Sequence, residues 1–150
     1  MTRREMREHC FKILFGLDFF PTEETAGQVE QYFESPEEDD TNQDGQSEII
    51  HQVEMKEDER AFLTDRVEGI AARIPELDIQ INEVAQGWKT RRMGKVDLTI
   101  LRQALYEMKY DSEVPEKVAI NEAVDLAKKF GGKDSPAFIN GVLAKLVSAE

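Results

Sequence analysis

The chain has 150 residues, a formal net charge of −12 and a single cysteine, Cys10. This length suits one domain, expected over residues 1–150, with a core that needs no disulfide, and a lone cysteine excludes an intramolecular bridge and the paired Cys/His spacings of zinc sites. The charged N-terminus has no apolar stretch behind it, and no segment approaches the roughly 20 apolar residues of a membrane span, so we expect a cytoplasmic protein with no membrane partner.

The negative charge is concentrated in one part of the chain. Residues 34–59 hold eleven acidic side chains and one basic one, a net −10, which leaves −2 for the other 124 residues. Two segments are basic: residues 1–15 carry a net +2 and residues 88–102 a net +4. The acidic total therefore does not exclude a nucleic-acid partner, because a local basic patch is enough to attract phosphates.

The first expected helix covers residues 2–20 and ends at Pro21. Its apolar residues recur at the spacing of one helix face turned toward a core, and they are Met6, Cys10, Ile13, Leu14 and Leu17. A second helix is expected over residues 23–33. The next stretch combines proline, glycine and many carboxylates, so residues 36–47 are expected to form a mobile acidic loop.

Three further helices are expected in the middle of the chain, over residues 58–74, 78–87 and 98–110. Asp97 stands immediately before the third of them and is its expected N-cap. That helix is apolar on most sides, which indicates a central position in a helical bundle. Trp88, at the junction before it, is interpreted as a packing anchor.

Two well-delimited helices complete the pattern. One covers residues 118–130 and stops at Gly131 and Gly132, and the other has Ser135 as its expected N-cap and Pro136 at its first position. No run of alternating β-branched residues is long enough for a sheet. The sequence therefore predicts an all-α fold, a compact single-domain bundle of about seven helices.

Few residues are suited to catalysis. His9 and Cys10 are neighbours, but on a helix they point about 100° apart and do not face each other as a nucleophile and its base would. His51, Glu54 and Glu57 fit a solvated charged face better than a set of metal ligands. The sequence has no glycine-rich phosphate loop. We therefore expect a protein that is not an enzyme and has no metal or cofactor.

Three segments of the chain resemble stretches of one known protein family. The stretch VPEKVAINEAVDLAKKFGGKDSPAFINGVL, residues 114–143, resembles the family's signature, most specifically in AINEAV, LAKKFG and NGVL. The segment before it, WKTRRMGKVDLTILRQALYEM, resembles a family helix, and REMREHCFKILFGLDF resembles the arginine-bearing first helix. Together the three segments hold 67 of the 150 residues and follow the family's order, and the family that they resemble is the NusB family of transcription antitermination factors.

The resemblance implies an all-helical protein of two subbundles that binds boxA-type single-stranded RNA together with NusE, a ribosomal protein of the small subunit, in the transcription elongation complex. Such a factor would support the synthesis of ribosomal RNA. The RNA-binding positions that the resemblance implies are Arg3, Arg4, Arg7, Asp134 and Phe138. The positions implied for the NusE-like partner are Phe15 and Asp97.

The residues give a separate argument for two of these positions. Phe15 lies on one helix face with Arg4 and Phe11, about 155° from the centre of the apolar stripe, and aromatic residues beside an arginine are typical of binding surfaces. The alternative is that both rings pack against another helix of the bundle, and this applies more to Phe11 than to Phe15. Phe138 lies about 90° off the apolar stripe of the last helix, where an aromatic ring suits base stacking. A core position is the alternative there.

Other interpretations stay open at this point. A purely protein-binding adaptor would use the acidic loop as its working part. An RNA-binding domain of the same fold precedes a cytosine methyltransferase in some ribosomal RNA enzymes, but a chain that ends at Glu150 leaves no room for a cofactor-binding domain. The basic residues after Trp88 would either extend an RNA surface or meet the acidic loop. Exposed apolar faces suit a homodimer as well as the partner protein.

Overall fold

The computed structural model describes residues 1–34, 36–41, 47–52, 55–85 and 89–148, so Trp88 and its expected packing role lie outside the described residues. Contacts divide the chain into two compact units, Met1–Glu68 and Gly69–Glu150. Seven α-helices lie in the described part of the chain, which confirms the predicted all-α class. None of the described helices is long and apolar enough to cross a membrane.

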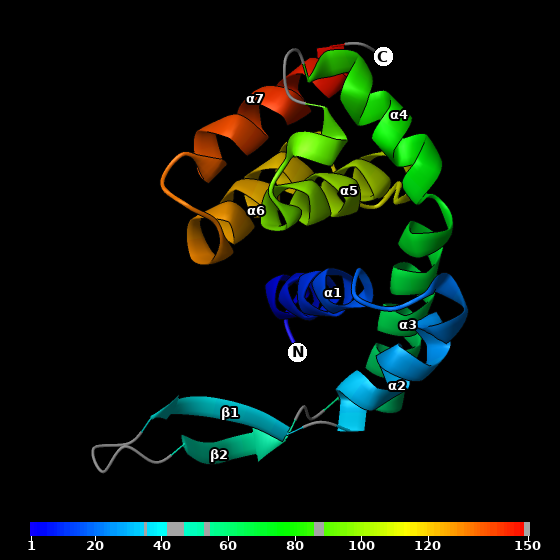
Figure 1. Ribbon diagram of the computed structural model, residues 1–150, viewed down its shortest axis with the longest axis vertical. Helices are drawn as coiled ribbons and strands as arrows, with labels where there is room; N and C mark the ends of the chain where they lie inside the picture. Colours follow the sequence, from blue (N-terminus) through cyan, green and yellow to red (C-terminus); the bar gives the residue numbers. More distant parts are fainter. Residues whose placement is uncertain (35, 42–46, 53–54, 86–88, 149–150) are drawn as a thin grey trace. The chain divides into compact units, whose positions relative to one another are not determined.

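The first unit is built from helices joined by turns: α1 (Arg3–Leu17), the 3-10 turn η1 (Thr22–Glu24), α2 (Thr25–Glu34) and the start of α3 (Glu57–Ala72). A capping box starts α1, because the Thr2 hydroxyl accepts the Glu5 N–H at 3.1 Å and the Glu5 carboxylate accepts the Thr2 N–H. Helix α1 packs against α2 (Figure 1). The buried apolar residues of the two helices are Cys10, Phe11, Ile13, Leu14, Val29 and Phe33.

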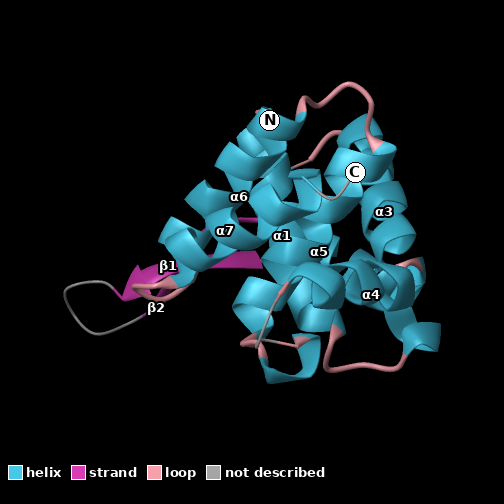
Figure 2. Ribbon diagram, turned by 90° about the horizontal axis from the view of Figure 1, so that it is seen from above, coloured by secondary structure: helices cyan, strands magenta, loops and turns pink. Residues whose placement is uncertain are grey.

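A two-stranded antiparallel ribbon lies between α2 and α3 in the sequence. The sequence pattern did not predict this ribbon. Strand β1 (Pro36–Thr41) pairs with β2 (Ser47–Gln52), with Pro36 opposite Gln52 and Thr41 opposite Ser47 (Figures 1 and 2). The expectation of a loop is therefore wrong for residues 36–41 and 47, whereas residues 42–46 lie outside the described part. Strands pair through backbone hydrogen bonds, so an acidic segment of low strand propensity can still form one.

The second unit is organised around one central helix. It contains α4 (Ile74–Val84), the 3-10 turn η2 (Thr90–Arg92), α5 (Lys95–Tyr110), α6 (Glu116–Phe130) and α7 (Ser135–Ser148). Helix α5 contacts α4, α6 and α7, which confirms its predicted central position (Figure 1). Two contacts join the Arg102 guanidinium of α5 to the Asp78 carboxylate of α4, at 2.8 and 2.7 Å. This ion pair holds α4 against the central helix.

The helices of this unit begin earlier than the sequence pattern predicted, α4 by four residues and α5 by three. Gly94 rather than Asp97 is the N-cap of α5, and Asp97 lies in the first turn of the helix. An acidic side chain is favourable at either position, because both lie close to the unpaired N–H groups at the helix start, and the pattern did not distinguish them. Helix α4 starts at Ile74 and includes Pro75, which is tolerated in a first turn because its missing N–H would have no partner there.

Close packing determines the turn between α6 and α7. Gly131 is the C-cap of α6, and a Cβ atom at this position would lie 2.6 Å from Cβ of Ser135 and 2.8 Å from the carbonyl oxygen of Ala127. Ser135 is the first residue of α7 rather than its N-cap, and its hydroxyl accepts the N–H of Gly132 at 3.0 Å. Only glycine leaves room for this turn, which sets where α7 begins.

Candidate nucleic-acid interface

Three arginines lie on the first two turns of α1. Arg3 and Arg4 are exposed and Arg7 is half-buried. At about 100° per residue the three side chains fall within an arc of about 100° on one side of the helix. The structure therefore brings the three predicted RNA-binding arginines together on one face of α1.

The capping box keeps this arginine group on a helical backbone. Hydrogen bonds from Thr2, first from its side chain and then from its backbone, hold the pKa of Glu5 below its ordinary value of 4.5. The Glu5 carboxylate is thus engaged with the helix start, at 3.0 Å from the Thr2 hydroxyl. Although Glu5 stands between Arg4 and Arg7 in the sequence, its charge also stabilises the turn that carries them.

The other two predicted RNA-binding residues lie at the start of α7. The N–H of Phe138 donates to the carbonyl oxygen of Asp134 at 3.1 Å, the first hydrogen bond of the helical ladder. Asp134 is exposed and Phe138 is half-buried, whereas the next residue, Ile139, is completely buried. Phe138 is therefore set off from the apolar stripe of α7, as the sequence pattern indicated, and part of it remains accessible.

The turn before α7 carries lysines that the sequence analysis missed. Lys128 and Lys129 end α6, Lys133 precedes Asp134, and all three side chains are exposed. The Lys129 ammonium lies 5.5 Å from the centre of the Phe130 ring. The signal was present as KKFGGK, three cations in six residues between two helices. These lysines supply positive charge beside Phe138, where Ala137 supplies none.

The arginine group belongs to the first compact unit, and the Phe138 turn belongs to the second. Each is a local site with its own cations. The first presents guanidinium groups on a capped helix, and the second presents exposed lysines on the turn that leads to Phe138. Both arrangements suit a phosphate backbone, and the second also suits the stacking of an unpaired base.

Phe15 belongs to a row of three phenylalanines, with Phe11 and Phe15 on α1 and Phe19 two residues after its end. Its ring stacks on that of Phe11, with 6.0 Å between centroids, and meets the edge of Phe19 at 6.2 Å. Exposure rises along the row, from 4% for Phe11 through a half-buried Phe15 to 65% for Phe19. The alternative of a core position therefore applies to Phe11, whereas Phe15 and Phe19 present aromatic surface.

Asp97, the second residue expected to bind the partner, is half-buried in the first turn of α5. Its Oδ1 atom is buried and has no hydrogen-bond partner among the described residues. A buried carboxylate oxygen without a donor is costly, so this atom would gain from a donor supplied by another molecule.

His9 and Cys10, the residues weighed as a catalytic pair, have separate surroundings. The Nδ1 atom of His9 is hydrogen-bonded to the Tyr32 hydroxyl, which joins α1 to α2. Cys10 is buried at 2% exposure. The two side chains thus serve different parts of the packing in the first unit.

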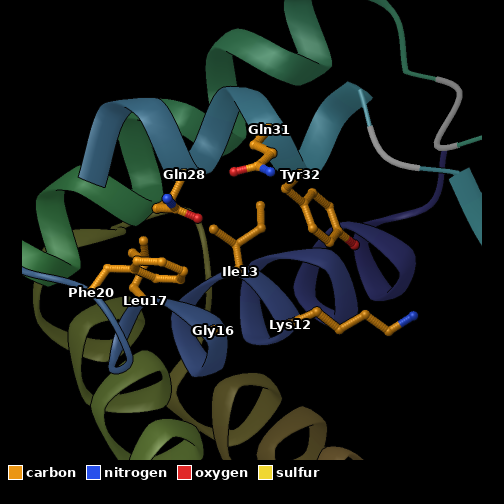
Figure 3. Close-up of a pocket in the computed structure, with 8 residues that line it drawn as sticks. All are labelled: Lys12, Ile13, Gly16, Leu17, Phe20, Gln28, Gln31 and Tyr32. Carbon is orange, nitrogen blue, oxygen red and sulfur yellow. The ribbon is translucent and has the colours of Figure 1, made fainter. Parts of the chain in front are cut away.

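A shallow groove of about 250 Å³ runs between α1 and α2 (Figure 3). Ile13 lies at its middle, with Tyr32 on one side and Leu17 and Phe20 on the other. At about 100° per residue the groove faces some 130° away from Phe15, so it is separate from the phenylalanine row and from the arginine group.

Comparisons with known proteins agree on one family. The NusB family matches residues 4–148 of the chain. A transcription antitermination protein NusB from Lachnoclostridium phytofermentans is 42% identical over 147 residues, covering 98% of this chain and 99% of that protein. Its counterpart from Agathobacter rectalis is 43% identical over 145 residues, covering 97% and 98%.

Solved structures share the fold. The chain is similar to T. maritima NusB with a TM-score of 0.79 and 26% identity, over 99% of this chain and 92% of that one. A chain in the crystal structure of antitermination factors NusB and NusE in complex with dsRNA matches with a TM-score of 0.72 and 21% identity, over 99% and 97%. At this lower identity the second likeness concerns the fold alone.

Proposed function

Because the chain belongs to the NusB family, we propose that it is a non-catalytic RNA-binding factor of transcription antitermination that supports the transcription of ribosomal RNA. Its RNA would be of the boxA type, single-stranded, and its protein partner a NusE-like ribosomal protein of the small subunit. The full-length relatives at 42% and 43% identity are antitermination proteins, which supports this assignment.

The observation that carries the RNA-binding role is the half-exposed Phe138 at the start of α7, beside an exposed, lysine-rich turn. Single-stranded RNA is commonly held by an aromatic ring under a base and by cations along the backbone. Phe138 would stack on a base and the lysines would contact phosphates. Asp134 would accept a hydrogen bond from a base or a ribose hydroxyl.

The arginine group on α1 would contribute sequence-independent contacts. Arg3, Arg4 and Arg7 lie on one face, and a guanidinium can hold a phosphate through two parallel hydrogen bonds. Such contacts add affinity and position the RNA, whereas contacts with the bases select its sequence.

The phenylalanine row and Asp97 would bind the NusE-like partner. Phe15 and Phe19 offer aromatic surface of the kind that anchors protein interfaces, and Oδ1 of Asp97 offers a buried acceptor that a partner donor can satisfy. In the absence of the partner the aromatic surface of Phe15 and Phe19 would suit a second copy of the chain. We place the resulting complex in the cytoplasm, on the transcription elongation complex.

The test is a salt titration of binding to boxA-type RNA. For a single strand, log K falls with log salt by about 0.7 per phosphate contact, so removing three contacts by Arg3→Gln, Arg4→Gln and Arg7→Gln should flatten the slope by about 2. Phe138→Ala should weaken binding by about 1–3 kcal/mol and leave the slope nearly unchanged.

An RNA of scrambled sequence serves as the control ligand, and Lys109→Gln with Lys117→Gln as the control variant, since these exposed lysines lie around the connection between α5 and α6. Equal affinity for boxA-type and scrambled RNA, with Phe138→Ala unchanged, would contradict the proposal. Binding of the partner protein without any RNA binding would instead favour a purely protein-binding adaptor.

A further inference from the structure

A third basic group lies on the connection between α4 and α5. Its residues are Lys89, Arg91 and Arg92, all exposed, and η2 holds the two arginines. Neither Arg91 nor Arg92 forms an ion pair with another described residue. The group thus presents positive charge that its described surroundings do not neutralise, in a chain whose total is −12.

Asn82 of α4 holds this connection in place. Its side-chain oxygen accepts the N–H of Thr90 at 2.7 Å, and its backbone oxygen accepts a hydrogen bond from the Lys89 ammonium at 3.3 Å. The N–H of Arg92 closes the turn on the carbonyl oxygen of Lys89 at 2.8 Å. The two arginines are therefore carried by an ordered backbone that is tied to a packed helix.

The 3-10 geometry separates the two guanidinium groups. A 3-10 helix has three residues per turn, so successive side chains point about 120° apart. Arg91 and Arg92 therefore cannot both bind one small anion unless one side chain folds back toward the other. They suit two anionic groups placed one after the other, which is the arrangement of a nucleic-acid backbone. Adjacent like charges repel, and a polyanion would offset this cost at both positions.

We propose that Lys89, Arg91 and Arg92 form a further phosphate-binding site, which contacts the RNA backbone outside the segment read by Phe138. The inference rests on the proposed function, because it assigns this basic group to the same RNA. The contacts are independent of sequence, so the site adds affinity and salt dependence without changing which RNA is preferred.

The first experiment compares Arg91→Gln/Arg92→Gln with the unaltered protein. Fluorescence anisotropy measures binding to a boxA-type RNA long enough to extend beyond the boxA segment, between about 0.05 and 0.3 M monovalent salt. Two lost phosphate contacts should lower the slope of log K against log salt by about 1.4 and the affinity by about 25-fold at 0.1 M salt. The loss should be the same for a scrambled RNA.

The matched control is Lys109→Gln/Lys117→Gln. It removes the same charge from the same unit, and Lys109 lies at the opposite end of α5, a helix of 16 residues and so about 24 Å long. Screening at 0.1 M salt should restrict its effect to less than about three-fold. An equal loss in both variants would mean that only net charge matters and would overturn the inference.

A second comparison tests whether the arginines instead meet the acidic strand β1. Arg91→Gln/Arg92→Gln is measured again in a protein carrying Glu37→Gln, Glu38→Gln, Asp39→Asn and Asp40→Asn. A loss of RNA affinity that persists there supports the phosphate site. If the loss disappears when the acidic strand is neutralised, the arginines contact the ribbon. If Arg91→Gln/Arg92→Gln leaves RNA affinity unchanged but weakens binding of the NusE-like protein, the arginines contact that partner. Either result overturns the inference.

Phe138→Ala, measured in the same series, separates this inference from the proposed function. If Phe138→Ala weakens binding to boxA-type RNA and Arg91→Gln/Arg92→Gln does not, only the phosphate site between α4 and α5 is wrong. If the unaltered protein prefers no RNA sequence and Phe138→Ala has no effect, while the arginine variant still loses affinity, the phosphate site stands and the boxA assignment fails. If no variant changes RNA binding, both are overturned.

Discussion

Thr2 is the N-cap of α1, and the first turn of the helix, which carries arginines of the arginine group, depends on it. Its hydroxyl caps α1 and, with its backbone N–H, lowers the pKa of Glu5. When folding lowers the pKa of a carboxyl, that group stabilises the fold at any pH above its ordinary pKa, which is 4.5 for Glu5. The stabilisation is lost as the pH falls through the lower pKa of the folded state. The first turn of α1 should therefore loosen in acid.

The variant Thr2→Ala tests this dependence. The pKa of the Glu5 carboxyl should then rise only part of the way to its ordinary value in an NMR titration, because the backbone N–H of residue 2 still donates to it. The amide of Glu5 should exchange its hydrogen roughly five-fold faster at neutral pH. Thr2→Ser, which keeps the hydroxyl, is the control. A Glu5 titration that does not change in Thr2→Ala would show that another group holds this carboxylate.

Gly131 is the residue on which the Phe138 turn depends. Its backbone φ of −94° is open to any residue, so the need for glycine comes from contact distance alone. We expect Gly131→Ala to cost about 1–3 kcal/mol in the free energy of unfolding, because the added methyl group meets Ser135 and the carbonyl of Ala127.

Gly132→Ala is the matched comparison, since a Cβ atom at Gly132 would meet no atom within 4 Å. Chemical denaturation of both variants measures the difference. Equal midpoints for Gly131→Ala and Gly132→Ala would show that the turn relaxes at little cost, and the close-packing explanation would be wrong.

At the scale of elements, α1 divides its aromatic residues between two roles. Phe11 is buried and Phe15 is half-buried, although they stack on each other. A buried phenylalanine truncated to alanine typically costs 3–5 kcal/mol of stability, whereas an interface anchor costs 2 kcal/mol or more of binding and little stability. Phe11→Ala should therefore melt well below Phe15→Ala in calorimetry, and an equal loss in both would place Phe15 in the core.

The acidic ribbon should be removable without loss of the helical fold. Pro36 and Gln52 are opposite each other in the register, so the ends left by deleting residues 37–51 already lie close together. The deletion removes six acidic residues and no Lys or Arg. Far-UV circular dichroism should show unchanged helix signal, and RNA binding should tighten at low salt and change less at high salt.

A protein that keeps the ribbon but carries amides at the same acidic positions is the control for charge alone. It should reproduce the tighter RNA binding. Affinity at low salt that stays the same in the deletion and in the amide variant would show that these acids do not oppose RNA binding.

How far the sequence predicts the fold differs between elements. The spacing of apolar residues, with Gly, Pro and capping residues at the ends, located all seven helices. Residues such as Ile139, Val142 and Leu143 fall on one face only if the segment is helical. The same signals misplaced the starts of α4 and α5, since Pro75 and Asp97 are as acceptable inside a first turn as before it. The ribbon was missed because pairing between strands depends on backbone contacts that side-chain patterns do not encode.

Some features of the candidate site could likewise be predicted from the sequence, and others could not. Sequence reasoning placed Phe138 off the apolar stripe, and the structure confirms that position, while its role in RNA binding stays a prediction. It did not foresee that Oδ1 of Asp97 lacks a donor or that Asn82 holds the basic connection, because both depend on which segments pack together. Such contacts join residues that are distant in the sequence or belong to different elements.

At the scale of the whole molecule, the charge is divided between the two units. Residues 1–68 carry the entire net −12, and residues 69–150 are neutral overall. Long-range attraction to RNA is therefore weak, and binding has to depend on short-range contacts with phosphates, which weaken with salt because they release counterions. A partner protein that docks on Phe15 and Asp97 would add contacts to RNA, so RNA and partner should bind cooperatively.

The most direct test of the account is the affinity for boxA-type RNA, measured by anisotropy with and without the NusE-like protein, for the unaltered chain and for Phe15→Asp. We expect the partner to tighten RNA binding by ten-fold or more, within the roughly 5- to 150-fold range of typical coupling between sites. Phe15→Asp should bind RNA alone within a few-fold of normal, melt near the normal temperature and lose the tightening. An unaltered chain whose RNA affinity ignores the partner, or a Phe15→Asp chain that is tightened as before, would contradict the account.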